Sequence, residues 1–330
     1  MKYTAERLKS YYPFDTHVID SVVDVADKLN RQSWEDIQKG IPETIKYSPS
    51  RGKNIEVLDI TPKDYDDTYV YYLPMANSLD ANMSFRLAVL KAVLPTKRLI
   101  AAGNPSAPGL GKGKVSLWNM PKVAHGDLRP KIDPVLRYLD SKDINSTTNV
   151  GYSLGADLAV TATIHADKYD HQVSQQTLME PASVKKRSLR GLGGDFASSE
   201  PPLEGYVKAT ESEAYREARH QANEQAHGKL GFMLGLGRPS NLAISKALTH
   251  DKFESRVWDS MYRQSDISTT IVSGTASELS NYELMLGVVD RLQKTFGDRL
   301  NYIPLQGQKH AMGDDVFLHA AMVLQADQTY

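Results

Sequence analysis

The sequence contains no cysteine, which excludes disulfides, thiolate metal ligands and a cysteine nucleophile. Long apolar runs are missing as well, since no stretch reaches the roughly eighteen apolar residues of a membrane-spanning helix. The N-terminal segment MKYTAERLKSYYPFD has no apolar core of the kind found in secretion signals. We therefore expect a protein without a membrane span that resides in the cytoplasm.

An excess of charge of one sign is also absent. The 39 basic residues almost cancel the 40 acidic ones, and neither sign forms a long run. Electrostatic capture of nucleic acid is therefore not expected, and a small-molecule partner fits better. The histidines are scattered and cysteine is missing, so the sequence predicts no metal site and no cofactor.

The sequence does contain a regular alternation of strand-like and helix-like segments. Short runs rich in β-branched residues predict strands at 55–60, 68–75, 97–106, 175–181, 268–274 and 301–305, with a further strand ending at Gly151. Apolar residues at helical spacing predict helices at 18–38, 84–94, 131–143, 154–167, 281–297 and 315–326. This alternation is typical of the α/β class, with a mostly parallel sheet covered by helices.

A long insertion interrupts the alternation between Pro181 and the strand at 268–274. At about eighty residues it far exceeds ordinary connections, so we predict a helical cap over the carboxyl edge of the sheet at 183–262. The core then comprises 1–182 and 263–330, with residues 1–40 as a helical N-terminal extension. The basic run KKRSLR at the start of the cap is interpreted as a solvated face rather than an anion site.

The segment TNVGYSLGADLAV, residues 148–160, has the pattern of a nucleophile elbow. A serine at a sharp turn from strand to helix is held in a strained conformation. Gly151 and Gly155 let the two elements approach each other closely. The hydroxyl of Ser153 is thereby presented above the sheet, and the N–H of Leu154, at a helix N-terminus, points toward any oxyanion formed there.

A serine nucleophile requires a base and an acid that orients the base. His310 is the candidate base, because YIPLQGQKHAMGDD places it in a loop between the last strand and the last helix. His319 lies in an apolar helix, where packing is the simpler interpretation, and His125 lies in a loop with no assigned role. In the chain order serine, acid, histidine, the segment IVSGTASELSN offers only Glu278 as the acid.

GYSLG, KHAMGDD and YYLPMANSL followed by RLIAAGNPS together resemble the α/β-hydrolase superfamily. The resemblance covers the chain except for about the first forty residues and the cap, and it implies the α/β-hydrolase fold. It also implies a second oxyanion donor, Met75 or Ala76, beside Leu154. The family's usual aspartate position is occupied here by Ser277. Some relatives take the acid from the preceding strand, where this chain has Glu180, so Glu278, Glu180 and no acid at all remain open.

These features predict a serine hydrolase that cleaves a carboxylic ester through an acyl-enzyme. We assign substrate contacts to Tyr152, next to the nucleophile, and to Phe232 and Met233 in the apolar, glycine-rich segment 228–244. That segment is either the lining of a pocket for an acyl chain or the internal core of the cap. Amide, thioester or lactone hydrolysis and acyl transfer stay open, and a catalytically silent hydrolase-like binding or structural protein is the competing hypothesis.

Overall fold

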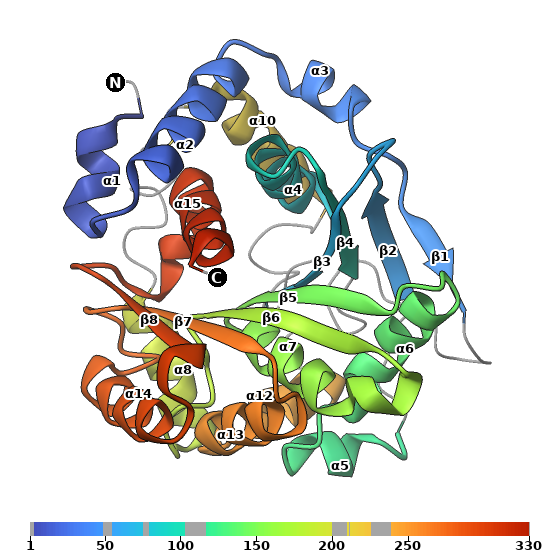
Figure 1. The fold of residues 1–330 in the computed structure, drawn as a ribbon, viewed down its shortest axis with the longest axis vertical. Coiled ribbons are helices and arrows are strands. Elements are labelled where there is room, and N and C mark those ends of the chain that lie inside the picture. Colours follow the sequence, from blue (N-terminus) through green and yellow to red (C-terminus); the bar gives the residue numbers. More distant parts are fainter. Residues whose placement is uncertain are drawn as a thin grey trace.

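The computed structural model describes residues 3–48, 55–74, 79–102, 117–199, 210, 212–225 and 239–329. Its centre is an eight-stranded sheet in the order β1-β2-β4-β3-β5-β6-β7-β8 (Figure 1). β1 and β2 are antiparallel to their neighbours, and the strands from β4 to β8 are parallel. The strands are β1 (Ile45–Tyr47), β2 (Ile55–Ile60), β3 (Asp67–Tyr72), β4 (Lys97–Ala102), β5 (Ser146–Tyr152), β6 (Gln172–Met179), β7 (Ser268–Gly274) and β8 (Leu300–Leu305).

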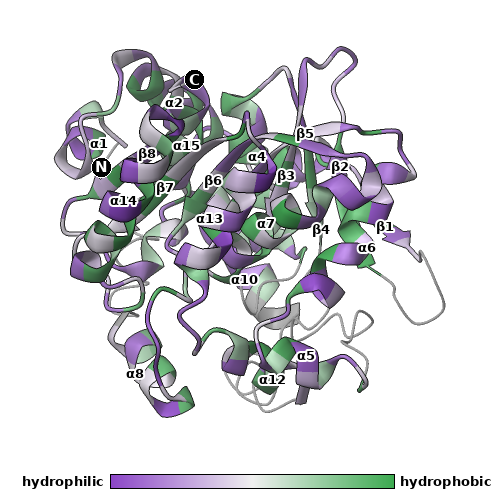
Figure 2. Ribbon diagram, turned by 60° about the horizontal axis from the view of Figure 1, so that its bottom comes forward, coloured by the Kyte–Doolittle hydropathy of each residue, from purple (hydrophilic) through white to green (hydrophobic). Residues whose placement is uncertain are grey.

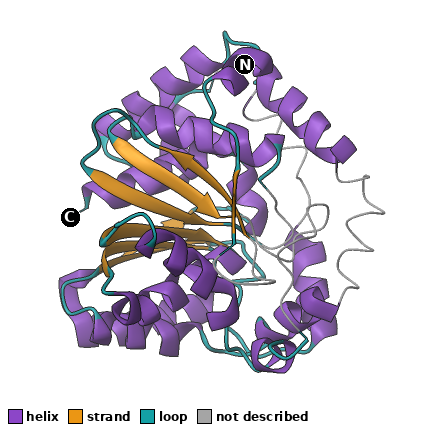
Figure 3. Cartoon of the chain, turned by 90° about the vertical axis from the view of Figure 1, so that its right-hand side faces the viewer, coloured by secondary structure: helices purple, strands orange, loops and turns teal. Residues whose placement is uncertain are grey.

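Helices cover both faces of the sheet (Figures 1 and 3). One layer contains α1 (Ala5–Tyr11), α2 (Thr16–Leu29), α3 (Trp34–Lys39), α4 (Ala81–Val93), α10 (Glu213–Gln225) and α15 (Val316–Gln328). The other contains α6 (Arg129–Asp140), α7 (Leu154–His165), α13 (Phe253–Arg263) and α14 (Tyr282–Phe296). Three further helices are α5 (Met120–Ala124), α8 (Leu189–Ser199) and α12 (Pro239–Ala247), and the short 3-10 turns are η1 (Ala166–Tyr169), η2 (Gly297–Arg299) and η3 (His310–Asp314).

Each face of the sheet has its own apolar core. In β3, Tyr69 and Tyr71 point into the core formed with α2, α4 and α15, whereas Val70 and Tyr72 point into the core formed with α6 and α7. All four side chains are buried, as expected for a central strand whose neighbouring residues alternate between two covered faces. The two cores fix the sheet, and the carboxyl ends of its parallel strands lie at one edge.

The predicted α/β class is confirmed, and each predicted strand and helix of the core has a counterpart. β3 ends at Tyr72, before the predicted residue 75, and residues 103–106 of a predicted segment lie outside the described part of the chain. The helix predicted over 18–38 is two helices, α2 and α3, because the side chain of Ser33 accepts a hydrogen bond from the N–H of Asp36 and starts a new helix. The short edge strand β1 was not predicted; its three residues are partly or fully exposed, so they show no apolar pattern.

The insertion contributes to both layers. α10 packs on α4, and the indole of Trp34 in α3 donates to the side chain of Gln221 at 2.7 Å. α12 lies against α5, and α8 lies apart from the sheet (Figure 2). α13 packs directly on α7, where Arg256 forms a buried ion pair with Asp157 at 2.6 Å. α13, which lies within the predicted cap 183–262, thus packs against a helix of the core.

None of the helices among the described residues is long and apolar enough to cross a membrane.

Asp315 is a fully buried carboxylate at the start of α15. Its side chain accepts from the N–H of Leu318 at 3.0 Å, and it lies 3.5 Å from Nη2 of Arg7 in α1. Burial, only partly offset by that N–H and by Arg7, raises the pKa of Asp315 to about 6. Since the ordinary value is 3.8, the folded protein keeps this proton between about pH 4 and 6 while the unfolded chain loses it.

We therefore expect this group to lower the free energy of unfolding as pH rises from 4 to 6, by about 3 kcal/mol for a shift of about two pH units. Asp315→Asn keeps a capping oxygen but does not titrate. Urea unfolding of both proteins between pH 4 and 7 should show the variant gaining stability relative to the native protein over that interval. Equal pH dependence in the two proteins would contradict the expectation.

Candidate active site

Ser153 occupies the sharp turn between β5 and α7. Its backbone has φ 57° and ψ −123°, a strained conformation for a residue with a side chain. The glycines on either side are required by close approach: a Cβ at Gly151 would lie 2.1 Å from the carbonyl oxygen of Gly155, and one at Gly155 would lie 2.0 Å from that of Tyr72. The sequence pattern thus produces the predicted elbow geometry.

His310 lies next to this serine. It begins the turn η3 after β8, and its Nε2 is 3.0 Å from Oγ of Ser153. Both side chains are buried in this structure, with 3% of Ser153 and 7% of His310 exposed. The structure therefore brings together, within hydrogen-bonding distance, two residues far apart in the sequence.

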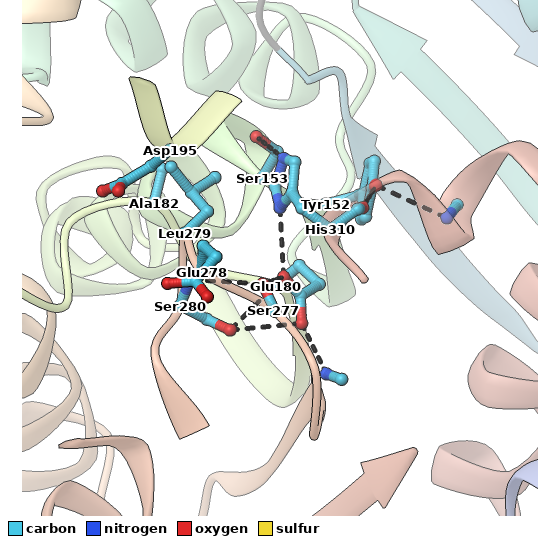
Figure 4. Close-up of polar contacts among 12 residues, drawn as sticks. Tyr152, Ser153, Glu180, Ala182, Asp195, Ser277, Glu278, Leu279, Ser280 and His310 are labelled. Carbon is cyan, nitrogen blue, oxygen red and sulfur yellow. Dashed lines mark hydrogen bonds and ion pairs between the residues drawn. The ribbon is translucent and has the colours of Figure 1, made fainter. Parts of the chain in front are cut away.

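Glu180 is the carboxylate that contacts His310. Its Oε2 lies 3.1 Å from Nδ1 of the imidazole (Figure 4). Glu180 follows β6 directly, has φ 49° and is completely buried. The backbone N–H of Gly274 donates to Oε1 at 2.5 Å, and the hydroxyl of Ser277 donates to Oε2 at 2.6 Å. The hydroxyl of Ser280 lies 3.2 and 3.3 Å from the two oxygens.

This set of donors explains how a carboxylate can be buried here. Each oxygen of Glu180 accepts at least one short hydrogen bond, and these bonds replace the water lost on burial. The donors come from the end of β7, the loop that follows it and the histidine turn. They fix the carboxylate in place against Nδ1 of His310.

The predicted pairing of Glu278 with His310 is corrected by this geometry. The side chain of Glu278 is exposed, and its backbone carbonyl accepts from Nζ of Lys185 at 3.1 Å. Glu278 follows Ser277 in the chain, and it is Ser277 that turns inward toward Glu180. The second candidate of the sequence analysis, Glu180, holds the position against the imidazole.

Tyr152, predicted to contact substrate, has a side chain that contacts the histidine turn. Its hydroxyl donates to the backbone carbonyl of His310, and its ring stacks on the imidazole with centroids 5.4 Å apart and planes 14° apart. Only 7% of Tyr152 is exposed, so its ring packs against His310 and has little accessible surface. The substrate contact of Tyr152 stays a prediction.

The structure describes some of the remaining predicted residues and not others. Leu154 is the first residue of α7, so its backbone N–H belongs to the unsatisfied N-terminal turn of a helix, as expected of an oxyanion donor. Met75, Ala76, Phe232 and Met233 lie outside the described residues. His319 is buried in α15 with Nε2 3.0 Å from the hydroxyl of Tyr71, and burial lowers its pKa well below the ordinary value. His125 is exposed, and its side chain contacts only the carbonyl of Pro121 among the described hydrogen bonds.

The turn that carries His310 is held by charged residues that the sequence analysis did not assign. Asp314 lies 3.3 Å from Nη2 of the buried Arg86 in α4 and 3.7 Å from Nη1 of Arg219 in α10. The hydroxyl of Tyr215 donates to the carbonyl of Asp314 at 3.2 Å. These residues are distant in sequence and follow no local motif, so only their position in space relates them to the site.

Over the part of the chain that the structure describes, no group of three or more histidine, aspartate or glutamate side chains is arranged to hold a metal ion.

No protein-family model matches this chain, and no curated protein matches its sequence. Solved structures do match its fold. A serine hydrolase from Cycloclasticus zankles has a TM-score of 0.56 and 13% identity, over 86% of this chain and 96% of that one. A structure described among the carboxylesterases of Nitrososphaera gargenis has a TM-score of 0.52 and 13% identity, over 86% of this chain and all of that one.

A bromoperoxidase from Bacillus anthracis is similar to the same degree, with a TM-score of 0.52 and 11% identity, over 86% of this chain and 99% of that one. Together with the strand order, these similarities show that the chain has the α/β-hydrolase fold. These proteins differ in their described activities, because one fold hosts many functions, so function must be argued from the site.

Proposed function

We propose that this chain is a serine hydrolase that cleaves carboxylic esters through an acyl-enzyme. One observation carries the proposal: an unbroken chain of contacts joins Oγ of Ser153 to Nε2 of His310 at 3.0 Å, and Nδ1 of His310 to Glu180 at 3.1 Å. This is the arrangement of nucleophile, base and orienting acid required for acyl transfer. Fold neighbours described as carboxylesterase and serine hydrolase support the same class.

In the proposed reaction, Nε2 of His310 takes the hydroxyl proton of Ser153 as Oγ attacks the ester carbonyl. Glu180 accepts a hydrogen bond from Nδ1–H and stabilises the imidazolium that forms. The N–H of Leu154, with Met75 or Ala76 as second donor, holds the negative oxygen. His310 then donates its proton to the departing alcohol oxygen as the C–O bond breaks, and water attacks the acyl-enzyme by the same path in reverse.

The buried contact between Glu180 and His310 favours a catalytic role for the histidine over a role in packing alone. A buried histidine needs no carboxylate partner, and His319 has none in the described hydrogen bonds. The strained backbone at both Ser153 and Glu180 supports the same conclusion, since conformations of this kind cluster at active sites. An apolar acyl group remains a prediction that rests on the segment 228–244, most of which lies outside the described residues.

A fluorophosphonate probe tests the proposal directly. We expect covalent labelling of the native protein at Ser153, located by mass spectrometry of peptides, because only a base-activated serine beside an oxyanion hole reacts readily. Labelling should be lost in Ser153→Ala and unchanged in Ser174→Ala, because Ser174 is an exposed serine in β6 whose hydroxyl donates only to the carbonyl of Thr147 among the described contacts. A native protein that stays unlabelled and cleaves no ester would favour the catalytically silent alternative.

A further inference from the structure

Phe196, in α8, is the second aromatic ring in contact with His310. Its ring centroid lies 5.6 Å from that of the imidazole, with the planes at 77°. Among the described residues His310 has two aromatic neighbours, and these differ in how far they are buried. Tyr152 is buried with its hydroxyl bonded to the histidine backbone, whereas Phe196 is only partly buried. Phe196 is therefore the aromatic ring beside His310 that has surface available for another group.

The position of Phe196 is fixed by an ionic cluster at its neighbouring residue, which we call the α8 anchor and which consists of Lys185, Arg187 and Asp195. Asp195 forms an ion pair with Nη1 of Arg187 and lies 3.1 Å from Nζ of Lys185. The side chain of Arg187 is 4% exposed, which makes this a partly buried cluster and not a solvated face. The solvated face predicted for KKRSLR is therefore wrong at Arg187.

The α8 anchor also binds both loops that surround Glu180. Nη2 of Arg187 donates to the carbonyls of Ala182 at 3.1 Å and Leu279 at 2.8 Å. Ala182 belongs to the loop after β6 that carries Glu180, and Leu279 to the loop after β7. Figure 4 shows Asp195, Ala182 and Leu279 grouped beside the Glu180 and His310 pair. The anchor thus places α8, and with it Phe196, at a defined position relative to the site.

We propose that Phe196 forms the wall of the leaving-group side of the site and confers a preference for esters of aromatic or other apolar alcohols. This rests on the proposed function, in which His310 protonates the departing alcohol oxygen. The alcohol part of the ester must then lie beside Nε2 of the imidazole, and Phe196 is the partly exposed ring next to it. Aromatic groups gain on contact with such a ring both from apolar burial and from edge-to-face geometry.

The test compares benzyl acetate with methyl acetate. Both esters carry the same acyl group and a primary alcohol, so the acyl side is constant and only contact with the leaving group differs. We expect kcat/KM in the native protein to favour benzyl acetate. Phe196→Ala should reduce the ratio of the two kcat/KM values by at least tenfold. A general loss of support for His310 would lower both values together and would leave the ratio unchanged. Phe196→Leu, which keeps an apolar wall, should retain part of the preference.

Trp258→Ala is the matched control, because this exposed indole in α13 stacks on Tyr262 and no described contact joins it to the site. Its ratio should equal that of the native protein. Asp195→Asn weakens the α8 anchor with Phe196 intact and should also lower the ratio. An unchanged ratio in this variant would overturn the role of the anchor.

A native protein that is labelled and cleaves both esters, but whose ratio is unaffected by Phe196→Ala, would overturn the proposal and leave the hydrolase function standing. If the native protein is neither labelled nor active on any ester, the proposed function fails and this inference falls with it.

Discussion

His310→Ala is expected to lower kcat for an activated ester such as p-nitrophenyl acetate by about 10⁴-fold or more, and Ser153→Ala by a similar factor. The reason is that the two side chains act as one unit across a 3.0 Å contact. Without the base the hydroxyl is a weak nucleophile, and without the hydroxyl the base has no proton to take.

The double variant makes this prediction specific. Because either replacement alone removes the same step, the double variant should be within a few-fold of each single variant, measured by steady-state hydrolysis with the spontaneous rate subtracted. His125→Ala is the control, since the exposed side chain of His125 contacts only the carbonyl of Pro121 among the described hydrogen bonds. Its kcat should match that of the native protein. Effects of the two replacements that multiply in the double variant would mean that Ser153 and His310 work independently.

Glu180→Gln is expected to lower kcat by a factor between about 10² and 10⁴, whereas Glu278→Gln should change it less than twofold. Glutamine has nearly the same size and keeps one acceptor oxygen, but its NH₂ cannot accept a hydrogen bond. The donors of Gly274, Ser277, Ser280 and His310 all converge on the carboxylate, so an amide leaves at least one of them facing another donor. It also removes the charge that stabilises the imidazolium.

Glu278 is a close control for this experiment, because it is the same residue type in the neighbouring loop with an exposed side chain. The chain order serine, acid, histidine favours Glu278 instead, and kcat values for both variants on one ester decide between the two residues. A loss in Glu278→Gln with little change in Glu180→Gln would return the acid to the loop after β7. An unchanged kcat in both variants would indicate a serine–histidine dyad.

The acid that contacts His310 is difficult to assign from the sequence, because it depends on which of two loops reaches the imidazole. Ser277 Oγ and His310 Nδ1 both lie within hydrogen-bonding distance of the same oxygen of Glu180. The space beside the imidazole can therefore be reached from the loop after β7 or from the loop after β6. Here a glutamate reaches it from β6, and a serine at the usual aspartate position donates to that glutamate.

The sequence by itself determined the features that local chain chemistry encodes. Alternating and β-branched runs mark strands because burial on two faces selects them, as in β3 and β7. The elbow at Ser153 was predictable because only glycine fits where the atoms of strand and helix approach to about 2 Å of a hypothetical Cβ. His310 was predictable from its place after the last strand.

Only the tertiary structure decided which distant residues meet. Glu180 points at His310 because a positive φ at the end of β6 and donors from β7 turn it inward, neither of which is visible in the letters LMEP. α13 joins the core through Arg256 and Asp157, although its sequence continues the polar insertion. Phe196 contacts His310 because the α8 anchor binds α8 to the loops around Glu180. Such contacts depend on strand order and loop conformation, and the free energy that selects them is shared among residues far apart in the chain.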